Sequence, residues 1–184
     1  MDAQEAAVVA ATRAWLERAV IGLNLCPFAK AVHAKGQVHF AVSAADSAER
    51  VLEDLGAELD ALLASDPAER ETTLLVVPHC LGEFLEFNAL AARGERLIRK
   101  RGREGVVQLA TFHPDYRFAD SGEDDMDNFS NRSPYPTLHL LRESSIARAV
   151  SAFPDPESIY GANVAALRRL GRQGWEALDV GPAR

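Results

Sequence analysis

The chain has 184 residues, of which 47% are hydrophobic and 26% charged, and its formal net charge is −7. This length and this proportion of hydrophobic to charged residues are typical of one globular domain with a hydrophobic core. We therefore assign residues 1–184 to a single domain. An acidic chain without a basic, aromatic-rich patch excludes non-specific nucleic-acid binding, and no apolar run is long enough for a membrane span. The N-terminus lacks the basic start of a signal peptide, and two cysteines make no disulfide framework, so we expect a cytoplasmic protein with reduced thiols.

The N-terminal part predicts a long helix followed by a short one. Apolar residues at helical spacing predict the first helix over residues 3–23, with Asp2 as its N-cap. Pro27 cannot continue this helix but suits the first turn of a second one, which ends at Gly36. We therefore expect Cys26 at the N-cap of the short helix.

Strands and helices alternate over the next part of the chain. The continuous apolar run of residues 72–78 is typical of a strand that is covered on both faces. Alternation at these lengths requires crossover connections, so we predict an α/β fold with a small, mostly parallel sheet of three to four strands flanked by helices. The expected elements are a strand over 37–43, a helix over 45–65, a strand over 72–78, a helix over 82–101 and a strand over 106–112.

A long irregular segment, about residues 112–136, follows the last of these strands. It has neither helical nor strand periodicity, yet aromatic residues are spaced through it, so we expect a long ordered loop packed over a binding site. Residues 137–142 fit either a short helix or a fourth strand, and Ser133 with Pro134 resembles an N-cap and N1 pair, which favours the helix. The remaining helices are expected over 144–152 and 156–178.

Candidate site residues follow the predicted strands and the first helix break. The C-terminal ends of parallel strands meet at one edge of a sheet, and such edges bind ligands. His113 lies there and is a candidate general acid or base, although it could equally anchor the loop through backbone carbonyls. Cys26 is a candidate nucleophile because a helix N-terminus lowers a thiol pKa, and the alternative is a small buried hydrophobe.

A second candidate set consists of polar residues near the end of the long loop. Asn131, Arg132 and Ser133 place an amide, a guanidinium and a hydroxyl together, and Arg142 follows within a few residues. With a helix N-terminus, such groups form a cradle for a carboxylate or phosphate. The alternative is that the arginines pair with aspartates of the loop and hold it shut.

No metal or cofactor motif is present, so no cofactor is assigned. The sequence has no paired-cysteine zinc motif, no glycine-rich dinucleotide motif and no P-loop. Cys26, His113 and His139 with one carboxylate would offer zinc ligands, but their uneven spacing is not specific. We otherwise expect His139 to be a packed histidine.

Four segments together resemble a known family. They are IGLNLCPFA at 21–29, ETTLLV at 71–76, FHP at 112–114 and NRSPYPTLHLLRE at 131–143. They look like the bacterial family called domain of unknown function 1415, and the resemblance covers nearly the whole chain. It implies a single-domain cytoplasmic bacterial protein, and it implies no activity, cofactor or catalytic residue.

The sequence hypothesis is a small enzyme that acts on a small anionic molecule at the strand C-terminal edge. His113 would be the acid or base, Cys26 the thiolate, and Arg132 and Arg142 would hold the negative charge of the substrate. One alternative is a non-catalytic anion-binding protein that uses the same arginines. The other is a metal-binding protein that uses Cys26 and the histidines.

Overall fold

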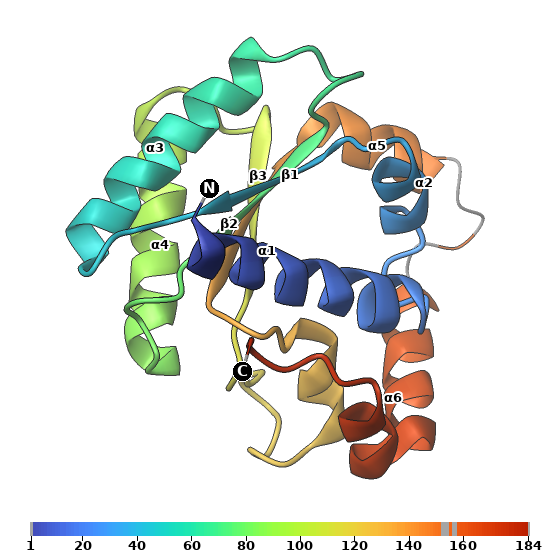
Figure 1. The fold of residues 1–184 in the computed structure, drawn as a ribbon. Helices are drawn as coiled ribbons and strands as arrows, with labels where there is room; N and C mark the ends of the chain where they lie inside the picture. The colour runs from blue at the N-terminus through green and yellow to red at the C-terminus, as the bar shows by residue number, and fades with distance from the viewer. Residues whose placement is uncertain (1, 152–154, 156–157, 184) are drawn as a thin grey trace.

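The chain folds around one four-stranded sheet with helices on both faces (Figure 1). The computed structural model describes residues 2–151, 155 and 158–183. The strands are β1 Val38–Val42, β2 Thr72–Val76, β3 Val107–Phe112 and β4 Thr137–Arg142. The helices are α1 Ala3–Trp15, the π-helix η1 Leu16–Ile21, α2 Ala29–Ala34, α3 Ala48–Ala64, α4 Phe84–Lys100, the 3-10 helix η2 Met126–Asn131, α5 Glu143–Ser151 and α6 Ser158–Ala177.

The sheet is mixed, so the prediction of a mostly parallel sheet is wrong. In the described residues the strand order is β1-β2-β4-β3, with β1 parallel to β2 and β4 antiparallel to both of its neighbours. The helix favoured for residues 137–142 is also wrong, because this segment is β4. Its side chains alternate: Leu138 and Leu140 enter the core on one face, while His139 lies on the other. That period of two is the period of a strand, and it outweighs the local N-cap signal.

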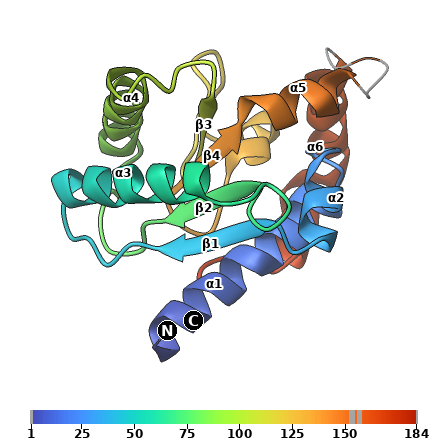
Figure 2. The ribbon, with the colours of Figure 1, turned by 90° about the horizontal axis from the view of Figure 1, so that it is seen from above.

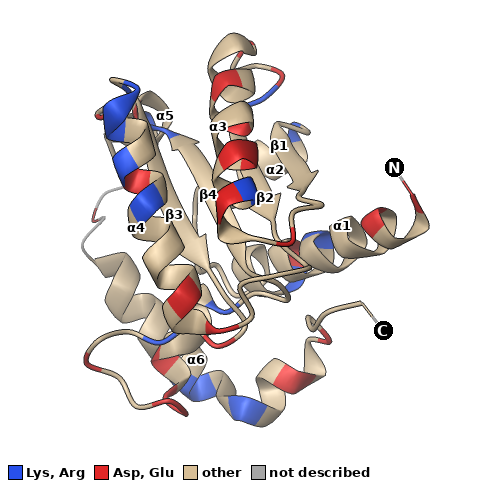
Figure 3. Cartoon of the chain, turned by 90° about the vertical axis from the view of Figure 1, so that its left-hand side faces the viewer, with Lys and Arg blue, Asp and Glu red and all other residues tan. Residues whose placement is uncertain are grey.

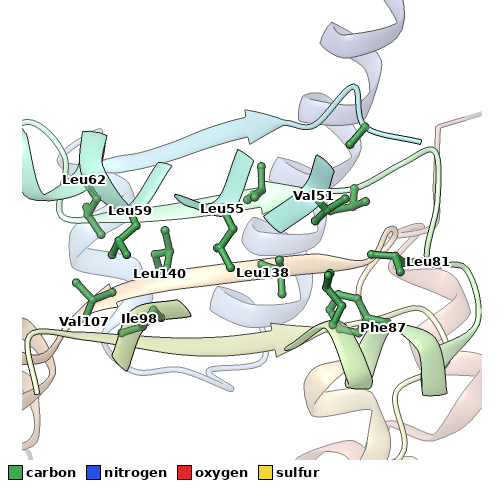
Figure 4. Close-up of a cluster of buried hydrophobic side chains, with 14 residues drawn as sticks. Val51, Leu55, Leu59, Leu62, Leu81, Phe87, Ile98, Val107, Leu138 and Leu140 are labelled. Atoms are coloured by element: carbon green, nitrogen blue, oxygen red, sulfur yellow. The ribbon is translucent and has the colours of Figure 1, made fainter. Parts of the chain in front are cut away.

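The main core lies between the sheet and the helices α3 and α4. Leu55, Leu59 and Leu62 of α3 are fully buried, and they point at Leu138 and Leu140 of β4 (Figure 4). The leucines on the inner side of α3, which recur at helical spacing, therefore pack on alternate residues of β4. Each such leucine contributes about 1.5–3 kcal/mol relative to an exposed one.

The opposite face of the sheet is covered by α1 and η1 over only part of its area (Figure 2). Trp15 packs edge-to-face on Phe112, with the ring centroids 5.0 Å apart. Its indole Nε1 donates to the carbonyl of Arg132 at 2.8 Å, so α1 is also joined to the end of the long loop. The helices α2 and α5 and the C-terminal residues Leu178 and Val180 also lie on this face.

The predicted first helix over residues 3–23 consists of two kinds of helix. The α-helix begins at the expected N-cap, since the Asp2 carboxylate accepts from the backbone N–H of Glu5 at 2.8 Å. It continues as one π-helical segment, η1. No helix among the described residues has both the length and the apolar character that a membrane crossing needs.

The long loop, residues 113–136, is fixed by a buried asparagine. The Asn128 side-chain carbonyl accepts from the backbone N–H of Phe118 at 3.1 Å, and its amide donates to the carbonyl of Gly122 at 2.7 Å. Asn128 is fully buried, so its polar atoms need these partners. One side chain therefore ties the start of the loop to η2.

Ion pairs join the same loop to α6. Figure 3 colours the acidic residues red and the basic residues blue along the chain. Arg168 forms a two-pronged pair with Asp127, at 2.8 and 2.7 Å, and Arg172 pairs with Asp124 at 2.7 Å. The helices predicted over 144–152 and 156–178 correspond to α5 and α6; residues 152, 156 and 157 lie outside the described residues. Gly171, with φ +67°, kinks α6.

Candidate functional site

A cavity of about 910 Å³ lies on the face of the sheet opposite α3 and α4, and we call it the sheet-face cavity. Side chains from all four strands make its floor. Its walls come from the end of α1, η1, α2, α5 and the connection between α3 and β2. The floor residues are Val38, Thr72, Leu74, Gln108, Ala110, Phe112, His139 and Leu141.

Small side chains keep this cavity open. Ala110 lies on the floor, Ala29 and Ala31 lie on the α2 wall, and Ala149 lies on the α5 wall. A larger apolar residue at any of these positions would occupy the space. The π-helix η1 adds Leu16 and Val20 to a third wall. Apolar surface with few polar groups is typical of small-molecule sites.

His139 is the titratable group on the floor. Its Nε2 lies 2.5 Å from the hydroxyl of Thr72, and that hydroxyl donates to the carbonyl of Leu140 at 2.7 Å. Burial lowers the pKa of His139 to about 4, so the imidazole is neutral near pH 7. The cavity thus contains an uncharged imidazole rather than a cation.

Cations lie among the residues that line the cavity near solvent. Lys35 is exposed, and its side chain has no ion-pair partner within the residues that the structure describes. Arg148, on α5, pairs with Glu71 at 3.1 Å and donates to the hydroxyl of Ser145 at 3.0 Å. These groups place positive charge beside an otherwise apolar space in an acidic protein.

Cys26 lines the wall of the sheet-face cavity but is not at a helix N-cap. Phe28 is the N-cap of α2, and Cys26 only accepts a backbone bond from Ala29 at 3.2 Å. The prediction placed the helix start too early, because Pro27 lies in the turn before α2 rather than in its first turn. Cys26 is half-buried and packs beside the cluster around Trp15.

His113 lies away from the cavity, on the α4 side of the sheet. It is fully buried and packs between the rings of Phe84 and Phe87, at centroid distances of 5.5 and 5.1 Å. Nε2 lies 3.0 Å from the carbonyl of Leu81, and Nδ1 accepts from the backbone N–H of Asp115 at 3.0 Å. Burial lowers its pKa. Both ring nitrogens are therefore engaged with the backbone, as in the loop-anchoring alternative.

Arg132 and Ser133 line a second cavity of about 610 Å³, at the C-terminal edge of the parallel strands. The Arg132 guanidinium stacks on the ring of Phe129, 4.3 Å from its centroid, and donates to the carbonyl of Glu123 at 2.8 Å. Ser133 donates to the carbonyl of Tyr135 at 2.6 Å. These polar groups therefore form hydrogen bonds within the loop itself and do not form an open cradle for an anion.

Asn131 is also engaged inside the protein. Its side-chain amide donates to the carbonyl of Thr111 at 3.1 Å, and its carbonyl oxygen accepts from the hydroxyl of Ser130 at 3.1 Å. The amide therefore joins the end of the loop to β3.

Arg142 fastens the end of α3 to β4. Its Nη2 donates to the carbonyls of Leu62, Ser65 and Arg70 at 2.5, 2.9 and 3.3 Å. The carbonyls of Leu62 and Ser65 lie at the C-terminus of α3, where a cation is favourable, and the carbonyl of Arg70 lies just before β2. Its Nε is buried without a hydrogen-bond partner among the described residues. Arg142 also lines the sheet-face cavity.

The structure therefore brings only some of the predicted site residues together. Cys26 and Arg142 line the sheet-face cavity, Arg132 and Ser133 line the second cavity, and His113 lines neither. Within residues 2–151, 155 and 158–183, no three His, Cys, Asp or Glu side chains form a group that could hold a metal ion.

Sequence reasoning missed His139 and Lys35 as cavity residues. A signal for His139 was present: a period-two interpretation of residues 137–142 places Thr137, His139 and Leu141 on one face of a strand. No comparable signal marks Lys35, because its position depends on how α2 packs over β1.

Comparison with known proteins gives one match. The model of the family described as "Protein of unknown function (DUF1415)" matches residues 7–177. Searches of the curated proteins and of the solved structures find no match. The family match covers almost the whole chain, including the floor and walls of the sheet-face cavity, and the protein is therefore a member of the DUF1415 family.

Proposed function

We propose that the protein binds a small amphipathic anion, with the apolar body of the ligand in the sheet-face cavity and its charged group beside Lys35 and Arg148. The observation that carries this proposal is a cavity of about 910 Å³ on an apolar sheet face, which falls within the usual size range of ligand pockets. The sequence hypothesis of an anionic ligand is kept, but the ligand is moved from the strand edge to the face of the sheet.

The apolar surface accounts for most of the expected affinity. Trp15, Leu74 and Phe112 contribute large apolar side chains to the lining. At about 0.8 kcal/mol per buried CH2 group, a chain of ten carbons contributes about 8 kcal/mol. Much of this offsets the loss of translational and rotational freedom, so we expect dissociation constants on the order of 10 µM to 1 mM.

The charge pattern supports an anion rather than a cation or a neutral lipid. Lys35 is free to pair with a ligand, and Arg148 has donors beyond the one that contacts Glu71. An exposed ion pair is worth at most about 1 kcal/mol, so the charge selects the orientation of the ligand more than it sets the affinity.

Titration with 8-anilinonaphthalene-1-sulfonate, an apolar body with one sulfonate, tests the proposal. We expect saturable 1:1 binding to the folded protein, with displacement by dodecanoate. Ala149→Phe fills the cavity and is expected to abolish this binding. The matched control is Ala147→Phe, an exposed position on the same helix that does not line the cavity. Equal binding by the two variants, or none by the wild type, contradicts the proposal.

The charged group is tested separately with dodecanoate. Lys35→Ala is expected to weaken its binding by a factor of about two to five, and this loss should shrink at high salt. Lys30→Ala removes the same charge from an exposed position of α2 that does not line the cavity. Identical effects of the two substitutions would mean that only net charge matters.

An enzyme with Cys26 as its nucleophile is the second candidate function. It is favoured by one observation: Cys26 and the neutral imidazole of His139 line the same cavity. Burial raises the pKa of the Cys80 thiol, which makes Cys80 an internal reference. A nucleophilic Cys26 is expected to react with iodoacetamide at pH 7 at least tenfold faster than Cys80, and dodecanoate should slow that reaction. Equal and ligand-independent rates would remove this candidate.

A further inference from the structure

We infer that His139 makes the sheet-face cavity selective for anions that carry a hydroxyl group within their apolar body. This inference rests on the proposed function, because it names the class of ligand that the cavity takes. It is drawn from the hydrogen bonds around one imidazole and from the side chains beside it.

The hydrogen bonds assign the position of the proton on His139. Thr72 has one hydroxyl proton, and the hydroxyl oxygen lies 2.7 Å from the carbonyl of Leu140, which can only accept. The same oxygen lies 2.5 Å from Nε2 of His139, so Nε2 carries the proton and donates it to Thr72. The other ring nitrogen, Nδ1, is therefore an acceptor with an unused lone pair.

The lone pair of Nδ1 is open to the cavity. Nδ1 has no hydrogen-bond partner among the described residues, and the only buried side-chain nitrogen or oxygen without a partner among those residues is Nε of Arg142. Nδ1 is thus accessible, and His139 lines the sheet-face cavity. A ligand group that enters the cavity can therefore reach it.

The surroundings of His139 make this acceptor distinctive. Its partners in the register of the neighbouring strands are Leu74 and Ala110, and the ring of Phe112 lies 6.1 Å from the imidazole. All three are apolar and line the floor of the cavity. The cavity thus offers an acceptor in the middle of an apolar floor, away from the cations that we assign to the charged group.

A neutral acceptor such as Nδ1 favours ligands that place a hydrogen-bond donor against it over ligands that place an apolar group there. A ligand hydroxyl donates a hydrogen bond to Nδ1 in place of the one that solvent would make. A purely apolar ligand excludes solvent and leaves Nδ1 without a partner. A carboxylate oxygen and Nδ1 are both acceptors, so their contact is unfavourable. The charged end of the ligand therefore stays near Lys35. The low pKa of His139 supports this, since the imidazole stays neutral over the physiological range.

Calorimetry with two series of fatty acids tests the inference. One series consists of saturated acids of 8 to 16 carbons, and the other of the same acids with a terminal hydroxyl, so that chain length scans the distance from Lys35 to His139. We expect one range of lengths in which the hydroxylated acid binds about tenfold more tightly than its partner. In His139→Phe this ratio is expected to fall to one or below at every length.

The possible outcomes separate the two proposals. If neither series binds the wild-type protein, the proposed function fails. If both series bind and the hydroxylated acids are equal or weaker at every length, the inference about His139 fails while ligand binding stands, because a hydroxyl without an acceptor only adds a desolvation cost.

Nitrogen-15 NMR of labelled histidine tests the same point without a substitution. We expect the free protein to show Nε2 of His139 protonated and Nδ1 unprotonated, and the Nδ1 resonance to shift when the hydroxylated acid is added. A proton on Nδ1 in the free protein would overturn the inference whatever the calorimetry shows.

Discussion

The neutral, half-buried imidazole of His139 predicts a specific loss of stability in acid. Burial lowers its pKa in the folded protein from 6.5 to about 4. Above pH 6.5 both folded and unfolded chains are neutral at this position, and its contribution to stability is fully present. As the pH falls from 6.5 towards 4, only the unfolded chain binds a proton there, so folding becomes less favourable. At 1.36 kcal/mol per pKa unit, the complete effect is on the order of 3 kcal/mol.

Urea unfolding of the wild type and of His139→Phe at pH 7.5, 6.5, 5.5 and 4.5 measures this effect. The difference in free energy of unfolding between the two proteins is expected to shift by about 2–3 kcal/mol against the wild type between pH 7.5 and 4.5. His113, whose pKa is also lowered by burial, is present in both proteins, so its contribution cancels. A difference that stays constant over this range would refute the assignment of a neutral, desolvated His139.

Three further predictions concern the stability of the fold, and all are measured as changes in the free energy of unfolding. Arg142→Met removes the donor to two carbonyls at the end of α3 and one just before β2, so we expect a loss of about 2–4 kcal/mol. Asn128→Ala leaves loop groups unsatisfied; we expect a loss of about 2–3 kcal/mol and faster proteolysis within residues 117–125. Gly94→Ala and Gly161→Ala should have opposite signs. A Cβ at Gly94 would meet core leucine methyls at 2.9 and 3.0 Å, which should cost about 1–3 kcal/mol, whereas Gly161 faces open space in α6 and should gain about 0.5–1 kcal/mol.

The elements that sequence predicted well are those in which local pattern and tertiary environment agree. The apolar run at residues 72–78 became β2, a strand buried over its whole length, because a continuous apolar run needs cover on both faces. The leucines of residues 45–65 became the inner face of α3 because their helical spacing puts them on one side of the helix. Residues 137–142 were misjudged because Ser133 and Pro134 gave a local helix signal, while the direction and pairing of β4 depend on where the long loop returns the chain.

The candidate site was less predictable because the partners of polar side chains lie far apart in sequence. Arg142 donates to the carbonyl of Leu62, 80 positions earlier, and no local pattern encodes that contact. Arg132 lies at the end of the loop, and its guanidinium donates to a loop carbonyl rather than to an aspartate. Cys26 and His113 were expected at one strand edge, yet the alternation of side chains directs His113 to the α4 face, away from Cys26.

The location of the sheet-face cavity follows from the order of the strands. The connections from β1 through α3 to β2, and from β2 through α4 to β3, both link strands that run in the same direction and advance across the sheet the same way. Because such crossovers have the same right-handed sense, they place both helices on one face. Within the described residues the opposite face receives no crossover helix, and it is covered by α1, η1, α2, α5 and the C-terminal segment that contains Leu178 and Val180. The sheet-face cavity lies between these elements, with His139 and its unused acceptor on the floor.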